Sequence, residues 1–424
     1  FGRACLLHTL SMAGRILGHS EDFPLSVGRY AVAISWDKSG QPVDVDLQGV
    51  VVDNRGAIID AVYYNNLKAL RCITHSGDEQ SGEKAGHDEV IWVGLNKLPD
   101  HVRMIIFVIA AHSGGHLRDV RNGLIHVLEE RQGNEVARFT MENSEEEVDM
   151  VAAFVRSERG SWYCQVIDEP AQDGQHFMDI LEPSIGNFIR KHIPSAPRRQ
   201  KVAFAMEKGA VFDLPRSSSL GAMTACLGWD VEGDGVDLDV SAVFFDASGK
   251  NVDACFFGNL ESCGFVHTGD NLTGEGEGDD ERIMCNLDSV PANVQQVFFV
   301  VNIYSRGVTF ECVRNAYCRI VDSSDTELAR YELREAAQQN ALVIARLFRE
   351  DPVRWGFQAL GTFARGQTWK DSVMDMRPIF QKSPRELQFP GQTTMRFSGA
   401  HGYGDTQCGV PGTLLSAPPL DTDI

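Results

Sequence analysis

The chain contains two copies of one sequence pattern, and this duplication constrains its fold more than any other feature. ISWDKSGQPVDVDLQGVVVDNRG at 34–56 aligns without gaps with LGWDVEGDGVDLDVSAVFFDASG at 227–249, at an offset of 193 residues. After a one-residue deletion, SGDEQSGEKAGHDE at 76–89 aligns with TGDNLTGEGEGDDE at 268–281, at an offset of 192. Collinear matches over about 130 residues predict two tandem domains with the same fold.

Each copy has the sequence pattern of a β-sandwich. VDVDLQGVVVD and VDLDVSAVFFD alternate partly before a D-x-x-G turn, and VQQVFFVVNIY is rich in β-formers without a helical period. Each copy then ends in a predicted helix, at 144–158 and at 334–350, the first with a capping box between Ser144 and Glu147. We therefore predict a mainly β protein with two tandem β-sandwich domains, each with a C-terminal helical segment.

Composition places the remaining boundaries. IGNFIRKHIPSAPRRQK lies between the copies and is basic, and the sequence after about residue 368 is rich in Pro, Gly, Ser and Thr without periodicity. The predicted organisation is an N-terminal extension at 1–27, a first domain at 28–185, a basic linker at 186–207, a second domain at 208–367 and a disordered tail at 368–424.

Charge and hydropathy exclude several classes of partner. The net charge of −20 argues against binding to nucleic acid, and IIFVIAA at 105–111 is far shorter than the ~20 residues of a membrane span. The ten cysteines include no CxxC pair, which indicates reduced core thiols and a cytoplasmic location. The opening stretch carries Arg3 and Arg15 without an acid before Glu21, so it fits either an organelle-targeting peptide or an amphipathic helix.

The stretch HTGDNLTGEGEGDDE at 267–281 has six acidic side chains, four glycines and no lysine or arginine. A phosphate-binding Walker loop is excluded, because Glu275 stands where that motif needs lysine. An EF-hand from Asp270 is also excluded, since its third and fifth positions would be Leu272 and Gly274. A solvated charged face and a calcium site built from several loops remain.

A second acidic cluster favours the calcium site. Glu275, Glu277 and Asp279 alternate with glycines, so an extended backbone points them to one side. The strand start GWDVEGDGVDLD adds three more acids, Asp230, Asp237 and Asp239. Between 229 and 288 there are fifteen acids and two bases, a net charge of −13. Calcium takes 6–8 oxygen ligands in irregular geometry, whereas magnesium demands near-ideal octahedra.

These motifs, with VRNAYCRIVD, ELARYEL and the late W-x-F-x-A-x-G, resemble the TerD family, weakly in the first copy and strongly in the second. The resemblance implies a calcium-binding β-sandwich without known catalytic activity that acts in chemical-stress responses, at a membrane-associated complex. It also implies two calcium ions in the second domain. Its metal ligands there are Asp230, Asp237, Asp239, Asp270, Glu275, Glu277, Asp279 and Asp280.

The first copy departs from this pattern. Lys84, Ala85 and His87 stand where the second copy has Gly276, Glu277 and Asp279. An ammonium beside the cluster neutralises one acid, and histidine is a poor calcium ligand. We expect this copy to bind calcium weakly or not at all and to serve as a scaffold.

The functional prediction is a non-enzymatic calcium-binding module in a stress response similar to tellurite resistance. No G-x-S-x-G elbow or Cys/His pairing indicates catalysis, so no catalytic residue is assigned. His112 and His116 lack a third zinc ligand, and the tryptophans at matched repeat positions fit core packing. The alternatives are a small-molecule receptor, for example for a cyclic nucleotide, and a calcium-dependent adaptor for a membrane or a protein complex.

Overall fold

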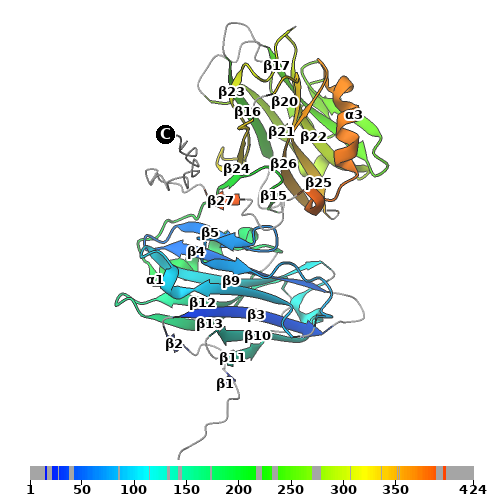
Figure 1. The fold of residues 1–424 in the computed structure, drawn as a ribbon. Helices are drawn as coiled ribbons and strands as arrows, with labels where there is room; N and C mark the ends of the chain where they lie inside the picture. Colours follow the sequence, from blue (N-terminus) through cyan, green and yellow to red (C-terminus); the bar gives the residue numbers. More distant parts are fainter. Residues whose placement is uncertain are drawn as a thin grey trace, which may run out of the picture.

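The protein folds into two β-sandwich domains that lie one above the other (Figure 1). The computed structural model describes residues 15–16, 22–26, 28–37, 43–84, 86–113, 115–130, 134–141, 146–171, 174–215, 222–231, 237–269, 278–305, 307–335, 337–350, 352, 354–387 and 395–397.

The first domain packs two sheets face to face. A seven-stranded sheet has the order β1-β11-β10-β3-β8-β7-β6, and a six-stranded sheet has the order β2-β13-β12-β9-β4-β5. The strands are β1 Arg15–Ile16, β2 Phe23–Leu25, β3 Arg29–Asp37, β4 Asp44–Asp53, β5 Ile58–Val62, β6 Lys68–Ala69, β7 Ile73–His75, β8 Glu89–Gly94, β9 Val102–Ser113, β10 Arg121–Glu129, β11 Asn134–Thr140, β12 Val148–Arg156 and β13 Trp162–Ala171.

The second domain repeats this arrangement. Its eight-stranded sheet has the order β19-β20-β21-β16-β23-β24-β14-β27, and its six-stranded sheet has the order β15-β26-β25-β22-β17-β18. The strands are β14 Phe204–Met206, β15 Val211–Asp213, β16 Met223–Val231, β17 Leu238–Asp246, β18 Asn251–Cys255, β19 Glu261–Ser262, β20 Phe265–His267, β21 Glu281–Cys285, β22 Val294–Ile303, β23 Val313–Val321, β24 Glu327–Glu332, β25 Ala341–Arg349, β26 Trp355–Ala364 and β27 Met395–Phe397.

Strand registers confirm that the two domains are copies. Asp46 of β4 lies opposite Ala110 of β9, and Asp239 of β17 lies opposite Asn302 of β22. Residues at an offset of 192 or 193 therefore occupy equivalent positions. The prediction of two tandem β-sandwiches is confirmed.

Helices cover the outer face of each six-stranded sheet. Beside the first domain lie η3 Phe177–Ile180, η4 Leu181–Ile185 and α1 Gly186–His192, and α3 Trp369–Phe380 covers the second (Figure 1). Strands such as β4, which is buried along its whole length, consequently have apolar neighbours on both sides. Four short helices complete the described elements: η1 Leu95–Lys97, η2 Leu117–Asp119, η5 Leu287–Ser289 and η6 Arg385–Leu387.

The predicted positions of the helices were wrong. The segments 144–158 and 334–350 form β12 and β25, while Ser144 of the proposed capping box lies outside the described residues. Both strands are buried on both faces, so their apolar runs lack the alternation that marks a half-exposed strand.

Three predicted boundaries also need correction. The first domain begins before residue 28, because β2 pairs with β13 in its six-stranded sheet. The linker contains α1, since the buried side chains of Phe188 and Ile189 hold that helix in the core. The predicted disordered tail contains α3, which packs Met376 and Ile379 against the second domain.

The core residues agree with the sequence analysis. The side chains of Trp36, Trp162, Trp229 and Trp355 are all buried. The eight cysteines that the structure describes are free thiols, and five of them are buried core residues. Within the described part of the chain, no helix has the length and apolar character needed to cross a membrane.

Candidate metal centre

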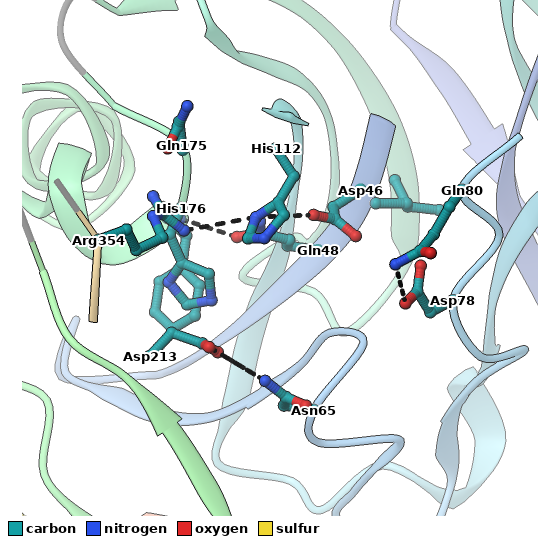
Figure 2. A network of polar contacts seen from close by, with 12 residues as sticks. Asp46, Gln48, Asn65, Asp78, Gln80, His112, Gln175, His176, Asp213 and Arg354 are labelled. Carbon is teal, nitrogen blue, oxygen red and sulfur yellow. Dashed lines mark hydrogen bonds and ion pairs between the residues drawn. The ribbon is translucent and has the colours of Figure 1, made fainter. Parts of the chain in front are cut away.

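Three carboxylates of the first domain come together at the start of β4. One oxygen each from Asp44, Asp46 and Asp78 lies within 4.8 Å of the other two. Figure 2 shows Asp46 and Asp78 of this cluster. Asp44 and Asp46 point from the same strand at alternating positions, and the loop after β7 supplies Asp78. Their repeat counterparts are Asp237, Asp239 and Asp270, so the structure brings together three positions that the sequence analysis assigned to metal in the other copy.

In the second domain the same strand start is present. Asp237 lies immediately before β17 and is half-buried, and Asp239 lies at its second position and is buried. The backbone N–H of Asp237 donates to Ser305 Oγ at 3.0 Å, which fixes this end of the strand. The predicted ligands Asp270, Glu275 and Glu277 lie outside the described residues.

Asp230 makes a contact within the protein that both domains share. Its Oδ2 accepts a hydrogen bond of 2.6 Å from Asn315 Nδ2, and Asp37 accepts the equivalent bond of 2.6 Å from Asn122. Both asparagines have a positive φ, at 51° and 49°, which is the left-handed region that asparagine tolerates. The bond therefore holds an irregular position within β23 in one domain and within β10 in the other.

Asp280 also has a structural partner in both copies. Its Oδ2 accepts a 2.8 Å hydrogen bond from the Trp229 backbone N–H, and Asp88 accepts the same bond from Trp36 at 2.9 Å. Burial raises the pKa of Asp280, while the Trp229 N–H opposes that shift. The acid thus ties the end of the acidic loop to the central strand β16.

Asp279 is held by cationic and phenolic donors. Arg319 donates two hydrogen bonds of 2.8 Å to its two oxygens, and Tyr317 donates a third at 2.9 Å. Burial by itself would raise the pKa of Asp279, but the bonds from Arg319 and Tyr317 bring it below its ordinary value. In the first domain, His87 stands at the position of Asp279 and His126 at the position of Arg319, and their ring centroids lie 4.7 Å apart. The two domains therefore differ in both residues of this contact.

The first-domain cluster connects to the second domain through His112. The Nδ1 atom of His112 lies 3.3 Å from Asp46 Oδ2 and 3.4 Å from a terminal nitrogen of Arg354 (Figure 2). Burial raises the pKa of Asp46 well above its usual range, and the charges of Glu89 and Asp44 add to this effect. The cluster is thus a place where negative charge is costly and where a cation would lower the energy.

Arg354 makes a buried ionic contact between the domains. Its guanidinium lies 3.3 Å from Asp179 Oδ2, with both side chains almost fully buried. Beside this pair, Asn65 Nδ2 donates to both oxygens of Asp213 at 3.0 Å (Figure 2). The sequence analysis missed these residues, although the repeat alignment places Ser161 opposite Arg354 and thereby marks a position where the copies differ.

These features define a class of protein: a tandem β-sandwich with carboxylates gathered at one end of the six-stranded sheet. The sequence profile described as TerD domain matches residues 22–180 and 202–368, which together make up most of the chain. The chain belongs to the TerD family, with two TerD domains in tandem.

Its relatives are bacterial proteins of stress resistance. The Tellurium resistance protein TerZ of Serratia marcescens is 44% identical over 174 residues, which cover 38% of this chain and 89% of that protein. The Stress response protein SCP2 of Bacillus subtilis (strain 168) is 39% identical over 185 residues, covering 38% of this chain and 92% of that protein. A crystal structure of a TerD homologue from Streptomyces coelicolor A3(2) aligns with 35% of this chain and 92% of its own, at 21% identity and a TM-score of 0.32.

Proposed function

We propose that this protein is a calcium-binding module of a chemical-stress response and acts by binding rather than by catalysis. The observation that carries the proposal is the gathering of Asp44, Asp46 and Asp78 at equivalent positions to Asp237, Asp239 and Asp270. Carboxylate oxygens are the ligands that calcium prefers, and a site built from a strand start and a separate loop suits its irregular geometry. The names of the relatives, which refer to tellurium resistance and stress response, support the stress-related role.

The principal site in this proposal lies in the second domain. Asp237, Asp239 and Asp270 form its centre, and Glu275 and Glu277 from the acidic loop complete the shell. Calcium would offset the mutual repulsion of these carboxylates and order the loop that carries them.

The other three predicted ligands have a different role in the proposal. Asp230, Asp279 and Asp280 keep the walls of the site in place through Asn315, Arg319 and the Trp229 backbone. Five acidic ligands remain, which fit one ion more readily than two.

The first domain is the weaker site. It keeps three carboxylates, but Ala85 replaces Glu277, Lys84 stands in the same loop, and Arg354 contacts His112 beside Asp46. The Lys84 ammonium donates to the Asp88 backbone carbonyl at 3.0 Å, which places a positive charge at the loop. Arg354 lowers the electrostatic need for a metal, because its charge already acts on Asp46.

Thermal unfolding with calcium and with chelator tests this proposal on the full-length protein. Calcium at 100 times its Kd should raise the free energy of unfolding by about 2.7 kcal/mol. Asp237→Asn and Asp270→Asn should remove most of that gain, while Asp44→Asn should change it little.

The matched control is Asp230→Asn, which removes a carboxylate of the same domain that the structure bonds to Asn315. It should lower stability while leaving the calcium-induced shift intact. Identical melting curves with calcium and chelator in the unmodified protein would remove the calcium proposal.

A further inference from the structure

The two domains contact each other through unlike surfaces. The first domain contributes what we call the docking face, which consists of β5 with its following turn to Asn66, His112, and the segment His176–Asp179. The second domain contributes the base edge, which consists of β15 and Arg354. Figure 1 shows β15 and β26 at the end of the second domain that lies above β5.

The second domain carries its own copy of the docking face. The repeat offset places Phe257 at the position of Tyr64, Tyr304 at that of His112, and Asp371 at that of Asp179. Local structure supports the last equivalence, because Thr368 and Asp371 form a capping box as His176 and Asp179 do. The copy lies along β18, which is the edge strand of its six-stranded sheet as β5 is of the other.

Exposure at the equivalent positions differs. Tyr64 and His112 of the first domain are half-buried. In the second domain, Phe257 is 44% exposed and Tyr304 is 53% exposed. Val252 and Leu260 on the same edge are also exposed. Large apolar side chains gathered on one edge mark an interaction surface.

The copy of the docking face also carries an acidic side chain where the first domain binds Arg354. Asp179 of the first domain uses one oxygen for the Gln175 and His176 N–H groups and for Arg354. Asp371 caps the Thr368 N–H at 3.1 Å with one oxygen in the same way, and its side chain is exposed. An arginine placed like Arg354 would therefore meet an acid here as well.

We propose that the copy of the docking face on the second domain binds a further TerD domain, on a partner chain, that offers an edge strand like β15 and an arginine at the position of Arg354. The contact is a heterologous one that repeats the contact between the two domains of this chain. It does not depend on calcium binding.

A second copy of this chain is the less suitable occupant. In the first domain, the position of Arg354 holds Ser161 and the position of Asp213 holds Pro24, as the registers of β2 with β13 and of β15 with β26 show. Both side chains are exposed, so this base edge is accessible but lacks the two charged groups. Its proline also removes a hydrogen-bond donor from the edge.

This difference allows a test within the full-length chain. Ser161→Arg with Pro24→Asp gives the first domain a base edge with both charged groups, so a second copy becomes a suitable probe. Sedimentation velocity should then show head-to-tail association that grows with concentration, while the unmodified chain stays monomeric. Adding Phe257→Asp should weaken that association by at least about tenfold.

The control variant adds Met284→Asp instead of Phe257→Asp. Met284 is equally exposed, at 44%, but lies on β21 in the other sheet, so association should persist. A charge-restored chain that stays monomeric, or association that ignores Phe257→Asp, overturns the proposal. The proposal is also overturned if the unmodified chain self-associates and Phe257→Asp abolishes that association. The occupant would then be a second copy of this chain, which lacks the arginine.

Discussion

Replacement of Arg354 by leucine should make the two domains unfold independently of each other. Arg354 and Asp179 lie 3.3 Å apart with side chains about 1% exposed, so removal of the cation leaves a buried, uncompensated carboxylate. Breaking a buried pair in this way costs about 3–5 kcal/mol. We expect Arg354→Leu to lower the free energy of unfolding by that amount, through the contact between the domains.

Urea unfolding measures the effect, with tryptophan fluorescence as one probe and far-UV circular dichroism as another. Trp355 follows Arg354 in the chain and is buried, so its emission should report the loss of the contact first. Two transitions should replace one in the variant, because the domains no longer support each other. Adding Asp179→Asn should recover part of the loss, since the stranded charge is then removed.

The control is Arg156→Leu, which removes an ion pair of 3.2 Å with Asp100, a fully exposed residue. Exposed pairs contribute about 0–1 kcal/mol, so this change should be small. Equal losses for Arg354→Leu and Arg156→Leu would refute the reasoning, because burial would then have no effect on the ionic contact.

Three further predictions follow from burial. Burial raises the pKa of Asp60 to about 7, so stability should fall as pH rises from about 4 to 7, by up to about 4 kcal/mol from this group. Asp60→Asn should flatten that part of the stability profile, while Asp253→Asn, at the exposed repeat counterpart, should not. Met376→Ala should destabilise the second domain by about 2–5 kcal/mol if α3 is part of its core, as measured by urea unfolding. In peptide mapping after alkylation of the native protein, Cys263 should react faster than the buried Cys285, and unfolding should remove the difference.

The fold could be predicted from the sequence because the duplication supplies two independent patterns for each strand. The helix predictions at 144–158 and 334–350 failed for a physical reason. Both segments lie in the middle of a sheet whose two faces are covered, and such runs have no period that separates strand from helix. Length and β-branching are then the remaining signals, and both were ambiguous here.

The candidate site could be predicted only in part. The spacing of Asp237 and Asp239 predicted two acids on one side of a strand, and their first-domain counterparts Asp44 and Asp46 have oxygens within 4.8 Å of each other. No pattern in the acidic loop could reveal that Asp279 faces Arg319, because forty residues separate them. The interface acid Asp179 was equally hidden, since its partner lies in the other domain.

The segment between the domains makes the contact within the chain differ from the proposed contact with a partner domain. Residues 193–203 join α1 to β14, and Gln200 fastens this segment to the Gly56 carbonyl at 2.9 Å. A short tether gives the domains an effective concentration in the millimolar range. The contact between the two domains of this chain therefore does not depend on protein concentration. The proposed contact on the β18 edge has no tether, so its occupancy would depend on the concentration of the partner domain.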